Sequence, residues 1–395
     1  MRLKLALVGA AALALSGCSM FSDEEPTYAE LDSEFTGSVG MRVVWEEEVG
    51  DGVGGYFSRL NPVRFGDNLI VADREGVVSA LAIADGREVW SVDLTDEDSG
   101  WSIPGGADSA RIAGGLVERY GRIYFGTENG EVGALSAADG SVEWQRDVGG
   151  EVIADPAVGD GLVVVHTSAG NVLGLDAETG EQRWSLVGEV PALSVRGGSA
   201  PLIANGGSIV GSEDGKLRVV INDNGQLAWE AVIARPAGTT EFERLVDVDA
   251  EPVVYGTNLY TIGFNGQLSA VEFQSGRVLW QRDYRGYQNL TVTALAIYLT
   301  DKQGHVYSVA RESGAEIWSN TSLWGRQLTA PVVVSDFIVV GDFEGYLHVL
   351  SRSSGAVVGR IELDGDGAYV EPLVIDGELF VQLRDGTVAR VELAI

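Results

Sequence analysis

Cysteine and histidine are scarce in this 395-residue chain. It has one cysteine, Cys18, and three histidines, His166, His305 and His348. A single cysteine excludes an internal disulfide framework. The histidines stand far apart, without the close spacing of metal ligands, and there is no nucleophile elbow or phosphate-binding loop. We therefore expect no metal ion and no cofactor, and we assign no catalytic residue.

Basic residues are outnumbered by acidic ones. The chain has 27 lysines and arginines against 58 aspartates and glutamates, a formal net charge of −31. Such a field repels nucleic acid, although it can also serve solubility alone. No uninterrupted apolar run reaches the length of about 20 residues that a spanning helix needs. These absences exclude a nucleic-acid-binding protein and an integral membrane protein.

Glycine and tryptophan, in contrast, recur at fixed spacing. A glycine is followed by a second glycine ten residues later and by a tryptophan fourteen residues later, in six full copies. The copies are Gly76, Gly86 and Trp90; Gly130, Gly140 and Trp144; Gly170, Gly180 and Trp184; Gly215, Gly225 and Trp229; Gly266, Gly276 and Trp280; Gly304, Gly314 and Trp318. A seventh copy has Gly359 in place of the tryptophan, and an eighth begins at Gly386. This recurrence indicates a repeat protein.

Each repeat predicts four short strands. Around the third copy these are residues 156–158, 162–166, 171–175 and 182–186, joined by glycine-containing turns that suit tight hairpins. Turn residues interrupt the pattern too often for a helix. Four antiparallel strands that repeat every 38 to 54 residues are typical of a β-propeller. A β-sandwich would not require this regular spacing. The sequence therefore predicts an all-β, eight-bladed propeller of four-stranded antiparallel blades.

A further tryptophan, Trp45, follows the apolar run that begins at Met41. We expect its strand to join the last blade and close the ring, which removes a free sheet edge. The periodic tryptophans favour a structural role as wedges between blades over ligand stacking; they are Trp45, Trp90, Trp144, Trp184, Trp229, Trp280 and Trp318. Gly359 leaves blade seven without a wedge, which predicts a looser seam there. Trp101 and Trp324 fall outside the pattern and are candidates for the surface.

The N-terminus has the pattern of an export signal. Arg2 and Lys4 precede an apolar stretch, and Leu15-Ser16-Gly17-Cys18 resembles the bacterial lipoprotein lipobox. That resemblance implies cleavage before Cys18 and lipid attached to it; an ordinary signal peptide is the alternative. Ser19 in the next position points to the outer membrane, with the protein anchored on the periplasmic face. We expect a signal peptide at 1–17, a lipidated acidic tether at 18–40 and the propeller at 41–395.

Three connections between blades are long: residues 91–110, 186–198 and 230–250. Connections from a fourth strand to the next blade all leave on one face, and the last two leave consecutive blades. Together they carry Leu193, Val195, Arg196, Asp247 and Asp249. An arginine with exposed aliphatic residues suits the centre of a protein interface, with carboxylates at the rim. The alternative is that Arg196 and an aspartate only pin the two loops together.

The repeat, in forms such as LDAETGEQRW, resembles the tryptophan-docking repeat of pyrroloquinoline-quinone-dependent dehydrogenases. The adjacent cysteines and the acidic calcium site of those enzymes are absent. The lipobox, the acidic tether, the eight repeats and the segments LSVRGGSAP and DVDAEPVV together resemble the BamB family over essentially the full length. These are lipoproteins of the outer-membrane β-barrel assembly machinery, the Bam complex.

The resemblance implies a non-enzymatic scaffold that binds the POTRA domains of BamA and works with other Bam complex subunits. It would assist insertion of nascent outer-membrane proteins, with unfolded clients as further partners. Leu193, Val195, Arg196, Asp247 and Asp249 would form or support the BamA-binding patch. Val195 stands where the family more often has leucine, and Gly198 stands at a position that is often acidic. A generic periplasmic protein-binding propeller and, less favoured, a quinone-dependent dehydrogenase remain as alternatives.

Overall fold

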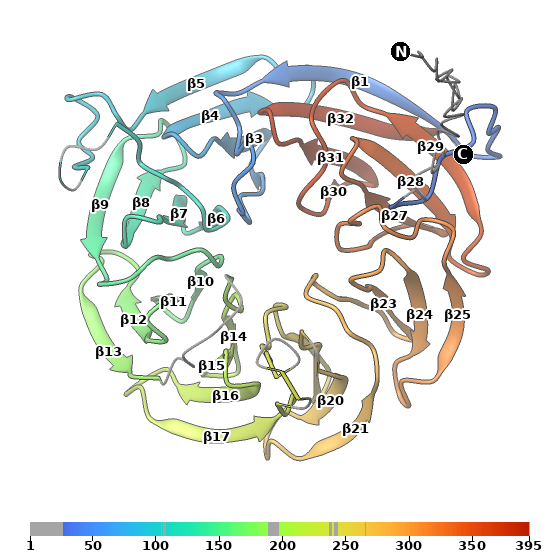
Figure 1. Cartoon of the computed structure of the whole chain (residues 1–395). Helices are drawn as coiled ribbons and strands as arrows, with labels where there is room; N and C mark the ends of the chain where they lie inside the picture. Colours follow the sequence, from blue (N-terminus) through green and yellow to red (C-terminus); the bar gives the residue numbers. More distant parts are fainter. Residues whose placement is uncertain are drawn as a thin grey trace, which may run out of the picture.

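The computed structural model describes residues 27–103, 105, 108–188, 197–236, 239–240, 244–264 and 266–394. Its named elements are all β-strands, grouped into eight four-stranded antiparallel sheets. The sheets stand around a central axis as the blades of a ring (Figure 1). The prediction of an eight-bladed propeller is confirmed. In the described residues, no helix is long and apolar enough to cross a membrane.

The first four blades follow in chain order. Blade one is β2 (Val63–Phe65), β3 (Asn68–Ala72), β4 (Val77–Ala82) and β5 (Glu88–Asp93); blade two is β6 (Val117–Arg119), β7 (Arg122–Gly126), β8 (Glu131–Ser136) and β9 (Val142–Asp147). Blade three is β10 (Ala157–Gly159), β11 (Leu162–His166), β12 (Val172–Asp176) and β13 (Gln182–Leu186); blade four is β14 (Leu202–Ala204), β15 (Gly207–Gly211), β16 (Lys216–Ile221) and β17 (Leu227–Val232). The strands predicted for the third repeat therefore agree to within one residue.

The remaining blades complete the ring. Blade five is β18 (Val253–Tyr255), β19 (Asn258–Thr261), β20 (Leu268–Glu272) and β21 (Val278–Arg282); blade six is β22 (Thr291–Val292), β23 (Ala296–Thr300), β24 (Val306–Ala310) and β25 (Glu316–Asn320). Blade seven is β26 (Val332–Val334), β27 (Phe337–Gly341), β28 (Tyr346–Ser351) and β29 (Val357–Glu362); blade eight is β30 (Leu373–Ile375), β31 (Glu378–Gln382), β32 (Thr387–Ala394) and β1 (Gly40–Glu48).

The ring closes through the two ends of the chain. β1 pairs antiparallel with β32, with Trp45 opposite Arg390, and forms the outer strand of blade eight. Figure 1 shows the two strands side by side, β1 in blue and β32 in red. The predicted closure by the N-terminal strand is confirmed, and blade eight has its full set of four strands because both ends contribute.

The repeated tryptophans lie at the seams between blades. The indole Nε1 of Trp144 donates to the backbone oxygen of Ala177 in the next blade, at 3.2 Å. Gly180 of that blade faces the same ring, since a Cβ there would lie 2.6 Å from it. The glycine contact repeats in each described seam that has a tryptophan: a Cβ on the second glycine of the following copy would lie within 3.0 Å of the indole. This glycine thus serves both the positive-φ turn and the close approach of the ring.

The seam between blades seven and eight is filled in another way. Val39, just before β1, donates its backbone N–H to the oxygen of Val358 at 2.9 Å. A Cβ on Gly359 would lie 2.6 Å from the backbone oxygen of Val39. Val39, Met41 and Val43 pack against the apolar core that blades seven and eight share. The N-terminal segment therefore covers the position beside Gly359 that the repeat pattern leaves without an indole.

The two tryptophans outside the pattern differ in exposure. Trp101 is only 6% exposed and packs on Phe125 with ring centroids 5.2 Å apart, in the core between blades one and two. The prediction of a surface role is therefore wrong for Trp101. Gly133 faces the ring of Trp101 and leaves space for it because it has no side chain. Trp324 is 41% exposed, as predicted.

Candidate functional site

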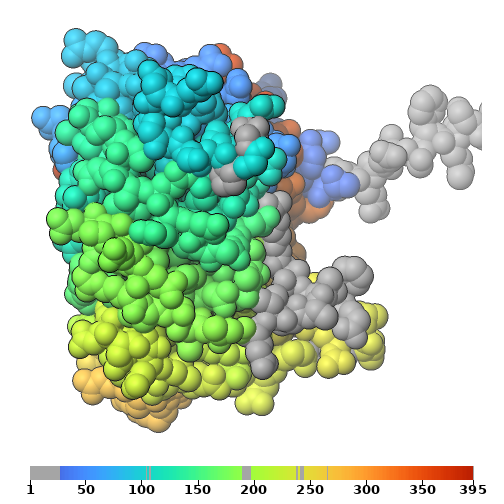
Figure 2. All heavy atoms as spheres, turned by 90° about the vertical axis from the view of Figure 1, so that its left-hand side faces the viewer, coloured from blue at the N-terminus to red at the C-terminus, as the bar shows by residue number. Residues whose placement is uncertain are grey.

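The connections from fourth to first strands share one face of the ring with the turns between second and third strands. The long ones span residues 94–116, 187–201 and 233–252. They start later than predicted because β5 continues to Asp93 and β17 to Val232, and they end later because the next first strands begin only at Val117, Leu202 and Val253. Figure 2 shows the ring from its edge, where the yellow segment after β17 extends beyond the blades. We call this side the loop face.

Only two of the five predicted binding residues are described. Leu193, Val195 and Arg196 lie outside the described residues, as does the predicted lipidation site Cys18. Asp247 and Asp249 are 1% and 3% exposed, so both carboxylates lie inside the ring rather than at the rim of a surface. Both lie in the buried C-terminal part of the 233–252 connection.

Asp249 joins three segments. Its Oδ1 accepts the backbone N–H of Gly198 at 2.8 Å, and its Oδ2 lies 3.0 Å from the guanidinium of Arg59. Arg59 precedes the first strand of blade one and also donates to the backbone oxygen of Asp249 at 3.2 Å. A buried carboxylate is stable when a cation compensates its charge and a backbone N–H donates a hydrogen bond to it, as here. It fixes the C-terminal root of the 187–201 connection against the 233–252 connection.

Asp247 has a different environment. Neither carboxylate oxygen has a hydrogen-bond partner among the described residues, and its backbone bridges to Phe264. Burial, together with the nearby charges of Asp249 and Glu213, raises the pKa of Asp247 from its ordinary value to about 8. Asp247 is therefore largely protonated at neutral pH.

His166 and Glu213 complete this group, with Nε2 and Oε1 3.7 Å apart. Burial lowers the pKa of His166. We name Arg59, His166, Glu213, Asp247 and Asp249 the loop-root cluster. Sequence reasoning found its two aspartates through their segment but missed the other three, because they come from different blades and stand in no shared motif.

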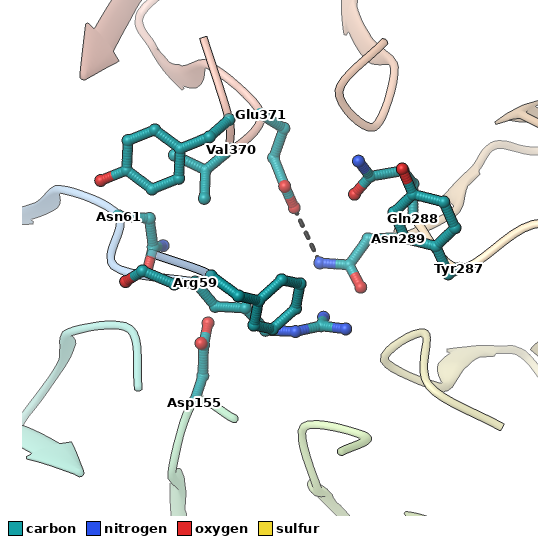
Figure 3. A pocket seen from close by; sticks show the side chains of 11 residues that line it. Arg59, Asn61, Asp155, Tyr287, Gln288, Asn289, Val370 and Glu371 are labelled. Atoms are coloured by element: carbon teal, nitrogen blue, oxygen red, sulfur yellow. Dashed lines mark hydrogen bonds between the residues drawn. The ribbon is translucent and has the colours of Figure 1, made fainter. Parts of the chain in front are cut away.

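A small pocket opens at the end of the axis (Figure 3). Its volume is about 50 Å³, and its lining includes Arg59, Asp155, Asn289 and Glu371. The amide of Asn289 donates to Glu371 at 2.8 Å, the dashed line of Figure 3. Burial raises the pKa of Asp155 to about 6, against the opposing effect of Arg59. This volume holds a few water molecules rather than an organic cofactor.

Metal binding receives no support in the described part of the chain, where no group of three or more His, Cys, Asp or Glu residues is placed to hold an ion. The acidic side chains around the axis instead surround Arg59, which Asp249, Asp155 and Glu371 all stabilise in its charged form. The described residues around the axis, which surround an arginine, therefore do not fit a quinone with its calcium ion. The arrangement suits the ordering of loops.

Two larger grooves flank the roots of the connections. One, of about 350 Å³ between blades three and four, is lined by apolar residues such as Leu186 and the exposed Val187 and by the charged Lys216 and Arg218. Both cations pair with Asp214. A groove with apolar walls and polar residues around it suits a protein segment.

The second groove, of about 510 Å³, lies between blades four and five. Val232, Ile233 and Val278 supply apolar surface, and the exposed Arg235 and Arg285 supply positive charge. Asp283 also lines this groove, so its charged residues are of both signs. Both grooves border the connections that the sequence singled out.

Comparisons with known proteins agree on a family. The family model described as outer membrane protein assembly factor BamB matches residues 40–107, 74–320 and 302–394. A curated relative of that name from Shewanella oneidensis is 41% identical over 382 residues, which cover 96% of this chain and 95% of the relative.

Solved structures agree as well. The crystal structure of BamB from Moraxella catarrhalis is similar with a TM-score of 0.79 at 26% identity, covering 89% of this chain and 100% of that one. A quinohemoprotein alcohol dehydrogenase from Comamonas testosteroni reaches a TM-score of 0.71 at 13% identity, over 89% of this chain and 76% of its own, and shows a shared fold alone. From the family model and the near full-length relative, this chain belongs to the BamB family of outer membrane protein assembly factors.

Proposed function

We propose that this protein is a non-enzymatic scaffold that binds the POTRA domains of BamA through its loop face and so assists insertion of outer-membrane proteins. Membership of the BamB family makes it an outer-membrane protein assembly factor. The observation that supports the finer statement is the hydrogen bond from Gly198 to Asp249, which ties the two long connections at their roots. A pre-ordered loop pair loses less conformational entropy on binding than two free loops.

The grooves beside these connections support a protein partner. They present apolar walls with charged residues nearby, and they continue from the connections onto blades three to five. In this proposal Leu193 and Val195 anchor the interface and Arg196 lies at its centre. Asp247 and Asp249 support the patch from beneath, since both are buried. The anchor is lipid on Cys18, which holds the protein at the periplasmic face of the outer membrane.

Calorimetry with the periplasmic region of BamA from the same organism tests the proposal. The mature chain in detergent should bind saturably, and Arg196→Glu should weaken binding at least a hundredfold, as loss of a central hot spot does. The matched control is Arg277→Glu, an exposed arginine paired with Glu272 in a turn on the opposite face. Equal binding by wild type and Arg196→Glu would contradict the proposal. A fall in the melting temperature of Arg196→Glu would show that Arg196 pins the loops.

We also propose that client strands pair with the outer strands of the blades. These strands have one edge outside the four-stranded sheets, and Leu279 on β21 and Ile317 on β25 expose apolar side chains there. An extended client can add to such an edge by backbone hydrogen bonds. Cross-linking of an unfolded outer-membrane protein from positions on β21 should be lost when that edge is blocked; cross-linking that persists would contradict this role.

A further inference from the structure

Residues 27–39 form an ordered strap on blade seven. The backbone N–H of Ala29 donates to the oxygen of Trp324 at 2.8 Å. The ring of Tyr28 packs edge-on against Phe343 with centroids 4.9 Å apart. Farther along, Arg360 donates to the backbone oxygen of Asp32 at 3.2 Å, and Val39 bonds to Val358 before β1 begins. The strap is thus attached at both ends and in between.

Arg326 holds the N-terminal end of the strap. Its side chain is only 1% exposed and donates to the oxygen of Ala29 at 2.9 Å and to Asp342 at 2.6 Å. Asp342 also bonds to the buried His348 at 2.7 Å, and Glu344 pairs with Arg326 from the other side. A buried arginine with this many partners is costly to disturb, because removal of one partner leaves charge without compensation.

The strap begins on the loop face. Trp324 and Arg326 lie in the connection that follows β25, and Phe343 lies in the turn between β27 and β28. Connections after fourth strands and turns between second and third strands share that side of the ring. The described chain therefore begins on the same face of the ring from which the 187–201 and 233–252 connections leave their fourth strands.

We propose that the strap fixes the orientation of the ring, so that the loop face is turned toward the lipid surface. This rests on the predicted lipid on Cys18. Eight residues lie between Cys18 and residue 27, and the nine residue-to-residue steps span at most about 30 Å when extended. The residue where the strap begins is held within that distance of the membrane. The opposite face lies farther away by about the length of a strand of five or six residues, roughly 17–20 Å.

The orientation restricts where a partner can sit. A protein bound at the connections lies between the ring and the membrane or beside that gap. A partner domain on the side of the ring away from the membrane could contact only the opposite face, and it could not bind the connections of the anchored protein. A partner that binds the loops must therefore also lie on the membrane side of the ring, whatever contacts it makes with the loops.

Energy transfer from the anchored protein to a labelled lipid tests the orientation. Since Cys18 carries the lipid, an introduced cysteine is the single site for a donor dye. Ser322→Cys places the donor on the loop face, and the matched Asp336→Cys places it in an exposed turn of blade seven on the opposite face. With phosphatidylethanolamine vesicles that carry a headgroup acceptor, we expect several-fold higher transfer efficiency from position 322. Equal efficiency, or higher efficiency from position 336, would overturn the proposal.

Two further variants test the strap itself. Ala29→Pro removes the N–H that donates to Trp324 but keeps the backbone oxygen that accepts from Arg326, whereas Arg326→Gln removes the cation from that network. Both should reduce the difference between positions 322 and 336; if Ala29→Pro folds and keeps the full difference, the strap does not set the orientation. Flotation with the vesicles is measured first, and a chain that does not float overturns the anchor and with it this inference. BamA binding is measured separately by calorimetry, so failure of either idea is recognised by its own readout.

Discussion

The Oδ1 atom of Asp249 accepts the backbone N–H of Gly198 at 2.8 Å, although the two residues are 51 positions apart. The other oxygen of the same carboxylate pairs with Arg59 at 3.0 Å. One side chain therefore links the entrance of blade one to the two connections of the candidate interface. A buried charge pair therefore holds the root of the 187–201 connection at Gly198.

Replacement of Asp249 tests this link. Asp249→Ala leaves the largely buried Arg59 without its nearest counter-charge, so we expect a loss of about 3–5 kcal/mol in the free energy of unfolding. Asp249→Asn keeps an oxygen for the N–H of Gly198 and should lose less. Urea unfolding measures both. An Asp249→Ala protein as stable as wild type would show that the pair is not structurally important.

The packing of tryptophan at the seams predicts that alanine substitutions at two glycines of blade three differ in their effect on stability. Gly180 and Gly161 have similar positive φ angles, 69° and 73°. A Cβ on Gly180 would lie 2.6 Å from the indole of Trp144, whereas a Cβ on Gly161 would have no atom within 4 Å. Both alanine variants carry the cost of placing a side chain at a positive φ angle. Overpacking against the indole should lower the free energy of unfolding of Gly180→Ala by a further ~1–3 kcal/mol. Thermal unfolding of the pair measures the difference; equal stability would argue against the wedge.

A side chain at position 359 should loosen the attachment of the strap at Val39. Gly359→Ala would bring a Cβ to 2.6 Å from the backbone oxygen of Val39, whereas Gly55→Ala meets open space. We expect faster hydrogen exchange at the amide of Val39 and earlier protease cleavage within 27–39 for the first variant alone. Unchanged exchange at Val39 in Gly359→Ala would mean that the strap does not depend on this contact.

The loop-root cluster predicts a pH dependence of stability. The pKa of Asp247 is raised from 3.8 to about 8, chiefly by burial. The folded chain therefore holds this proton more tightly than the unfolded chain. The stability it gives is fully present below about pH 4 and is lost as the pH rises toward about 8. Glu251, with its pKa raised to about 8 by burial, acts in the same direction.

Asp247→Asn removes the titration. Its free energy of unfolding should fall less steeply between about pH 5 and pH 8 than that of wild type, and the two should differ most at the alkaline end. Urea unfolding at a series of pH values measures both slopes. Parallel slopes would show that Asp247 does not titrate in this range.

Much of the ring follows from local sequence patterns. The paired glycines and the tryptophan set the turns and outer strands of each repeat, and Trp45 indicated the strand that completes blade eight. These features are predictable because a hairpin turn depends on a few consecutive residues and a strand on its own alternation. The segments of the candidate interface were found in the same way, as interruptions of a regular repeat.

Tertiary structure decided the environment of individual side chains. Trp101 is in the core because Gly133 of the next blade leaves space for its ring. Asp249 is buried because Arg59, 190 positions earlier, meets it at the axis. Arg326 lies beneath the strap because ring closure brings the N-terminal segment back to blade seven. The sequence by itself determined the repeat, the blades and the positions of the long connections. Only the closed ring decided which charges are buried together, because those contacts join residues that no local pattern relates.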